Sequence, residues 1–195
     1  KEQKIFRRGR VYFINIPDNV DIDIENQFGD VSLEDNTGIV SVNLSNGDFK
    51  ANSLDRISEL SIDFGDAEIN SVRSAKINTT FSKIIVSQSN DLVINSTSSR
   101  FELGKAGKID IESRRDKFFI GDISGISGIS YFTDYRIDNL TGNTDLDLKY
   151  GSFDVERVDD RFENIIIKSA YSDITTDFDP TASFNFEIRH TNAFV

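Results

Sequence analysis

The chain has 195 residues and a formal net charge of −11 at pH 7. Its length suffices for one domain with a core of its own, and its acidity argues against binding nucleic acid through a broad basic face. It has no cysteine, which excludes disulfides, thiolate nucleophiles and cysteine-ligated metals, and it shows no apolar run long enough for a membrane span. It also has no methionine, so we expect a processed or trimmed chain.

The chain opens with the basic stretch KEQKIFRRGR, for which we expect an extension over residues 1–10 in front of a single repeat domain over residues 11–195. A solvated end and the stub of a cleaved leader both fit this composition. The segment VYFINIPDN followed by VDIDIENQF, residues 11–28, is predicted to be the first coil of the repeat.

A corner motif then recurs: an aromatic or polar residue, a small or polar residue, a third residue that is usually charged, and an apolar residue. The third position is filled in turn by Asp30, Asp48, Asp66, Lys83, Arg100, Lys117, Asp134, Ser152 and Asp173. Successive members lie 17 or 18 residues apart, except for a last step of 21. Such a series indicates a repeat architecture.

Between corners, apolar and polar residues alternate, as where Val40, Val42 and Leu44 alternate with Ser41 and Asn43. Period two predicts half-buried strands, and no stretch shows a convincing helical period. Repeated strand pairs could form antiparallel hairpins or the coils of a parallel β-solenoid. The near-constant length favours the solenoid, because a coil must return to the same place. We therefore predict an all-β, single-domain parallel β-solenoid (β-helix) of about ten 17–18-residue coils.

Three predictions concern the corners. The fourth motif position is predicted to form one inward stack of Val31, Phe49, Ala67, Ile84, Phe101, Phe118, Tyr135, Phe153 and Ile174. The aromatic residues of the first position are predicted to form a second inward ladder of Phe28, Phe64, Phe81, Phe132, Tyr150 and Tyr171. Glycine at the second position suits a backbone that needs a positive φ or leaves no room for a Cβ.

The repeat is predicted to continue through HTNAFV and to stop at Val195, with Phe194 at an inward position. An uncovered coil end exposes apolar surface and unpaired strand groups. We therefore expect a following segment, a partner or a second copy to cover this end, which predicts self-association through the C-terminal coil end.

The GDV-type corners, the 17–18-residue coils and the closing SFNFEIRHTNAF resemble the bacterial β-strand-repeat proteins classed as adhesins, relatives of the head-domain modules of auto-transporter adhesins. The resemblance spans about residues 11–195 and implies a β-helix of the cell envelope, periplasmic or extracellular after removal of a leader. It implies no biochemical activity and no catalytic residues. The chain departs from the family's pattern at Lys83, Arg100 and Lys117, where that pattern has acidic or small residues.

Two features of the sequence are candidates for metal binding, a single histidine and a row of aspartates. His190 is the only histidine and cannot form a histidine-based metal site. Asp30, Asp48 and Asp66 would form a row of carboxylates about 4.8 Å apart, which Ca²⁺ could bridge. Side chains that turn into water and accept hydrogen bonds from corner amides explain the row better, so we predict no metal site and no cofactor.

A basic cluster is the remaining candidate site, formed by Lys105, Lys108, Arg114, Arg115 and Lys117. It could hold an anionic glycan or a neighbouring protein chain. The alternative is a polysaccharide lyase or hydrolase in which a basic residue abstracts a proton beside a carboxylate-bound Ca²⁺. The predicted loops are too short to build a deep pocket, so the sequence favours a non-enzymatic surface module, an adhesin or scaffold.

Overall fold

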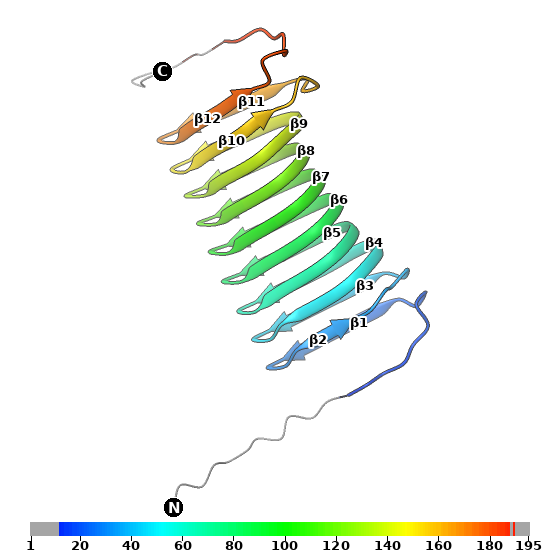
Figure 1. Cartoon of the computed structure of the whole chain (residues 1–195). Coiled ribbons are helices and arrows are strands. Elements are labelled where there is room, and N and C mark those ends of the chain that lie inside the picture. Colours follow the sequence, from blue (N-terminus) through cyan, green and yellow to red (C-terminus); the bar gives the residue numbers. More distant parts are fainter. Residues whose placement is uncertain (1–11, 188, 190–195) are drawn as a thin grey trace, which may run out of the picture.

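The computed structural model describes residues 12–187 and residue 189, and every regular element in them is a β-strand. The strands wind into one parallel β-solenoid (Figure 1). The strands are β1 (Ile22–Gln27), β2 (Val31–Leu33), β3 (Val40–Ser45), β4 (Phe49–Asp63), β5 (Asp66–Thr80), β6 (Lys83–Thr97), β7 (Arg100–Arg114), β8 (Lys117–Tyr131), β9 (Asp134–Lys149), β10 (Ser152–Val158), β11 (Ile165–Ala170) and β12 (Asp173–Phe178). The predicted fold class is confirmed.

Parallel pairing places each residue beside the one a full coil later in the chain. Phe49 lies opposite Ala67, and Ala67 lies opposite Ile84. From β4 to β9 one long strand makes almost the whole coil, bending halfway along its length, and a tight corner joins it to the next. The named register pairs are therefore 17 or 18 residues apart, which is why the motif spacing is so regular.

Nine corner residues have a positive φ and mark about nine turns, compared with the ten coils predicted. The difference lies at the two ends. Residues 12–21 form no strand, so only the second half of the predicted first coil pairs with the sheet. After β12 ends at Phe178, residues 179–187 form no strand either. His190 and Phe194 lie outside the described residues, as do residues 1–11.

The predicted inward stack forms the centre of the core. Seven of its nine members, from Phe49 to Phe153, are at most 2% exposed. The Phe118 ring stacks between those of Phe101 and Tyr135, at centroid distances of 4.6 and 5.0 Å. The prediction is wrong at the last position, because Ile174 is 41% exposed on the terminal strand β12, which pairs on one side only. Val31, on the short strand β2, is only half-buried.

The predicted inward ladder of corner aromatics is also wrong, because all six rings point into solvent. Their exposed fractions run from 47% for Tyr150 to 81% for Tyr171. Each of these residues has a φ between 51° and 62°, in the left-handed region. This conformation interrupts the strand alternation, so the corner residue faces outward like the residue before it.

The corner glycines do not have the positive φ, because the residue before each of them adopts it. They lie where successive coils approach closely: a Cβ added to Gly47 would overlap the carbonyl oxygen of Gly29, and one added to Gly65 would overlap that of Gly47. Of the two reasons expected for glycine here, the lack of room for a Cβ is confirmed.

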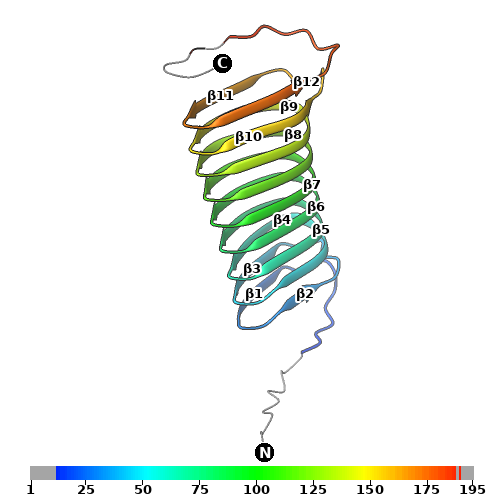
Figure 2. The ribbon, with the colours of Figure 1, turned by 60° about the vertical axis from the view of Figure 1, so that its left-hand side comes forward.

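The C-terminal end of the rod is partly covered by the chain itself. Figure 2 shows the segment after β12 crossing over this end. Phe184, in that segment, stacks on Phe178 at 4.3 Å and meets Phe162 edge-on at 5.6 Å. The described residues therefore close part of an end that was predicted to be open, while self-association remains a prediction.

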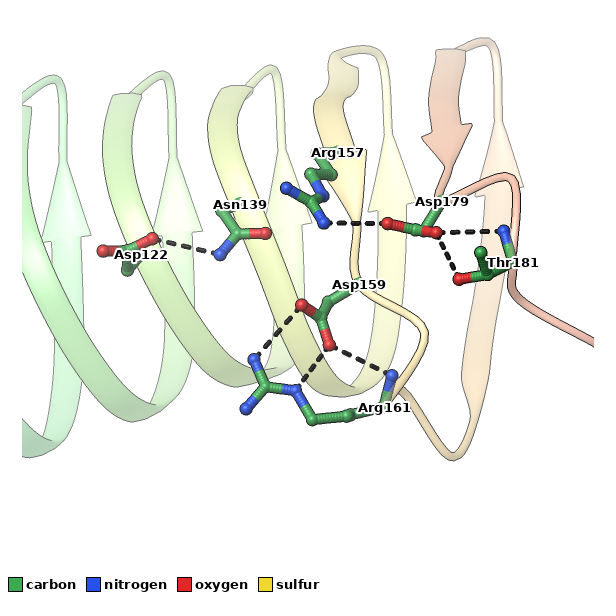
Figure 3. Close-up of polar contacts among 7 residues, drawn as sticks. All are labelled: Asp122, Asn139, Arg157, Asp159, Arg161, Asp179 and Thr181. Carbon is green, nitrogen blue, oxygen red and sulfur yellow. Dashed lines mark hydrogen bonds and ion pairs between the residues drawn. The ribbon is translucent and has the colours of Figure 1, made fainter.

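Each coil has a second turn, which we call the wide bend, where the long strand bends halfway along its length, opposite the tight corner. Ion pairs stabilise the same end of the rod at the wide bend of the last coils (Figure 3). Arg157 donates to Asp179 at 2.8 Å, across two consecutive coils. Arg161 donates through two side-chain nitrogens and its backbone amide to the carboxylate of Asp159. Hydrogen bonds from Arg161 lower the pKa of Asp159 to about 2.

Candidate ligand-binding surface

The tight corner carries a row of exposed aromatic rings that we call the corner ladder: Phe64, Phe81, Phe132, Tyr150 and Tyr171. The rings stack on one another along the axis of the rod. Phe64 and Phe81 have a centroid distance of 5.5 Å. Phe132 stacks on Tyr150 at 4.9 Å, and Tyr150 stacks on Tyr171 at 5.0 Å with planes 1° apart. The ladder therefore consists of one pair and one triplet.

These rings occupy a backbone position that does not favour them. A left-handed conformation costs an ordinary L-residue roughly 1–2 kcal/mol, and only Gly, Asn and Asp adopt it readily. Asn46 is the single corner residue of that kind, with a φ of 56°. Stacking returns about 0.5–1.5 kcal/mol per pair. Since the rings also lie in water, core packing does not explain why they are aromatic.

The corner ladder is interrupted between Phe81 and Phe132, where the corner residues are Ser98 and Arg115. We call this interruption the cation gap and define it by three exposed side chains, Arg114, Arg115 and Lys117. Within the described part of the chain, none of the three makes an ion pair.

Two further cations border the gap and are already paired. Lys83 and Arg100 both contact the carboxylate of Glu102, at 3.2 and 2.9 Å. The Arg100 guanidinium also lies 4.0 Å from the centroid of the Phe119 ring. The pairing of Lys83 and Arg100 leaves the three side chains of the cation gap as the free positive charge at this corner.

Asp116 sits in the middle of the basic run, yet its side chain points into the core and is 1% exposed. Its carboxylate accepts hydrogen bonds from the hydroxyls of Ser96 and Ser113, at 2.6 and 2.7 Å. It also accepts them from the backbone amides of Ser99 and Arg114, at 2.6 and 3.1 Å. Asp116, the acidic residue nearest in sequence to the three cations, thus accepts hydrogen bonds from amides and hydroxyls in the core and forms no ion pair with the cations.

The five basic residues named from the sequence do not form one patch. Arg114, Arg115 and Lys117 meet at the tight corner, whereas Lys105 and Lys108 lie halfway along β7, at the wide bend. Lys105 lines a shallow, open hollow there of about 670 Å³, together with Arg73 and other polar residues. These five residues are close in sequence, but the coil places them at two different bends.

A second hollow lies beside the cation gap on the face formed by the first half of each coil. It has a volume of about 560 Å³, and its lining includes Gly104 and Gly121 together with Phe119 and Asp138. Its surface mixes apolar atoms with the charged groups of Glu102 and Arg136. The sequence did not indicate this hollow, because it depends on glycines one coil apart lying side by side.

The row of aspartates has a structural explanation. Asp30 accepts a hydrogen bond from the amide of Asp48, and Asp48 accepts one from the amide of Asp66, each at 3.0 Å. The expected bonding of these carboxylates to corner amides is confirmed for Asp30 and Asp48. Over residues 12–187 and residue 189, no group of three or more His, Cys, Asp or Glu side chains is placed to hold a metal ion.

No protein-family model, no curated protein and no solved structure matches this chain. The resemblance to adhesins therefore remains a prediction from the sequence. None of the described residues belongs to a helix that could cross a membrane. The class that the structure defines is a parallel β-solenoid repeat protein with an aromatic and basic corner.

Proposed function

We propose that this protein is a non-catalytic binding module of the cell envelope, an adhesin or scaffold acting in the periplasm or outside the cell, and that its ligand is a linear glycan lying along the corner ladder. The observation that carries the proposal is the ladder itself: stacked rings, half or more exposed in most cases, in a backbone conformation that opposes them.

A straight row of binding groups suits an extended polymer. Within the stacked pair and within the triplet the rings repeat at the coil spacing, about 4.8 Å, so a chain parallel to the rod would meet a similar contact at each of these steps. Aromatic rings supply large apolar area with few rotatable bonds, and their polarised faces and edges attract C–H groups and oxygens respectively. Sugars offer both kinds of group.

A binding role also fits the corner better than catalysis does. A lyase of the kind considered above needs a carboxylate-held cation next to its base. Asp116, the carboxylate within the basic corner, is buried and accepts four hydrogen bonds, so it supports the backbone.

A glycan array with the purified, labelled chain tests the proposal. The variant Phe132→Asn/Tyr150→Asn removes two stacked rings while keeping a residue that tolerates the left-handed backbone, as Asn46 does. Phe28→Asn is the control, because Phe28 has the same φ region and is also exposed, but it lies beyond Asn46, apart from the stacked rings.

We expect the unmodified chain and the control to bind the same glycans, and the double variant to lose about tenfold or more in affinity. Loss of two aromatic contacts from a binding surface commonly has an effect of at least this size. Absence of binding to any glycan, or equal binding by the double variant, would refute the proposal.

A further inference from the structure

We infer that the cation gap is a subsite for a carboxylated sugar unit, so that the module selects an acidic glycan. This inference rests on the proposed function and names the ligand class of the same site. Phe81 and Phe132 bound the gap, and the three coil steps between them span about 14 Å at the usual strand spacing.

The two bounding rings each stack on another ring on one side only. Phe81 stacks on Phe64, and Phe132 stacks on Tyr150, in both cases on the side away from the gap. Among the described residues no ring or cation stacks on either face toward the gap. A sugar ring in the gap can place its C–H groups against these faces, whose π-electrons attract them.

The gap holds unpaired positive charge on an acidic molecule. Arg114, Arg115 and Lys117 are exposed and without ion-pair partners in the described chain, whereas the net charge of the whole chain is −11. Guanidinium groups bind carboxylates through two parallel hydrogen bonds, which gives geometric selectivity as well as attraction.

The corner that carries these cations is held in place before any ligand binds. The Asp116 carboxylate ties together amides and hydroxyls of two successive corners, and Ser113 shares a hydrogen bond of 2.7 Å with Thr133 of the next corner. A backbone fixed in this way loses little further freedom on binding, which favours affinity.

The charge pattern favours an acidic glycan over a nucleic acid. Beyond the gap, the aromatic stacks are flanked by exposed or half-exposed carboxylates, namely Asp63, Asp66, Asp134 and Asp173. A nucleic acid carries a phosphate on every unit and would place phosphates against these carboxylates. A glycan can carry its acid at the gap and neutral groups elsewhere.

Two probes with the same backbone test the inference. The first is a polygalacturonate that is mostly methyl-esterified but keeps scattered free carboxylates (the acid, or polyuronate), and the second is the same polymer fully methyl-esterified (the ester), which lacks the negative charge. A single-stranded oligothymidylate serves as the third probe. Affinities of the full chain are measured at one fixed ionic strength, because ionic contacts weaken as salt rises. Thermal unfolding of each variant confirms that it is folded.

The gap variant is Arg114→Gln/Arg115→Gln/Lys117→Gln. Its matched control, Arg73→Gln/Lys105→Gln/Lys108→Gln, removes the same charge from the wide bend. We expect the unmodified chain to bind the polyuronate at least tenfold more tightly than the ester, since charge-assisted hydrogen bonds are the strong ones. The gap variant should lose this preference, and the control should keep it.

Equal binding of acid and ester by the unmodified chain would overturn the inference, and so would equal losses in the two variants or tighter binding of oligothymidylate. If neutral glycans on the array bind through the corner ladder while acid and ester do not differ, the subsite is wrong and the proposed function stands. If no glycan binds at all, both fail.

Discussion

Two phenylalanines, Phe118 and Phe132, occupy neighbouring corners, and removal of the ring should destabilise the fold strongly at Phe118 and hardly at all at Phe132. Phe118 is 1% exposed and stacks on both sides, on Phe101 and Tyr135. Removal of a fully buried aromatic ring leaves a cavity and costs about 3–5 kcal/mol. With two stacked partners, Phe118→Ala should fall in the upper part of that range.

Phe132 is 50% exposed, stacks on one ring and has a φ of 56°. Replacing it with Asn forfeits about 0.5–1.5 kcal/mol of stacking with Tyr150. The same change relieves about 1–2 kcal/mol of left-handed backbone strain. The two effects nearly cancel, so we expect Phe132→Asn to change the free energy of unfolding by less than about 1 kcal/mol.

Urea titration followed by far-ultraviolet circular dichroism measures both changes. Stacked coils contact only their neighbours, and long arrays can unfold in stages, so hydrogen exchange of β8 and β9 should accompany the titration. A loss below about 1 kcal/mol for Phe118→Ala, or losses of similar size in both variants, would refute the assignment of inward and outward corner positions.

Three further predictions concern buried charge, close packing and pH. Asp116→Ala leaves four donors, three of them buried, without their acceptor and should destabilise the fold by at least about 2 kcal/mol in urea titration, with a smaller loss for Asp116→Asn. Gly128→Ala should lower the melting temperature markedly, because Gly128 has a φ of 131° and an added Cβ would overlap the carbonyl oxygen of Ile111. Since Arg161 holds the pKa of Asp159 at about 2, below its ordinary value of 3.8, the stability gained at Asp159 is complete above about pH 5 and should be lost as the pH falls toward 2. Hydrogen exchange of the last coils between pH 5 and about 2 should show this loss, and Arg161→Gln should reduce it.

The period of the corner motif and the alternation of apolar residues were sufficient to predict the solenoid and most of its core. Both follow directly from the geometry of a closed coil. The outward direction of the corner aromatics was not predicted. A strand alternation that continues from Ile62 would place Phe64, two residues later, on the inward face, whereas Phe64 is exposed. One signal was available: Ile62 and Ala67 are both inward but lie five residues apart, an odd interval that requires a break in the alternation.

The candidate site was harder to predict because the fold sorts residues by coil position. Lys105 and Lys117 are close in sequence but lie at different bends, whereas Arg100 and Lys117 are 17 residues apart and lie side by side. Asp116 looks like a surface acid in the sequence RRDK. It is buried because it occupies the inward corner position that other coils fill with Gly, Ser or Thr.

The constant register of the coils makes the length of this molecule adjustable in whole units. A deletion of one residue within a strand would turn every following side chain of that strand to the opposite face. A deletion of residues 98–114, one complete coil, would instead join two segments whose strands already have the same alternation and corner geometry. Such a change would bring Phe81 and Phe132 one step of about 4.8 Å closer while the neighbouring coils keep their pairing. Duplication or loss of coils therefore offers a simple evolutionary route by which such rods could acquire gaps of different width.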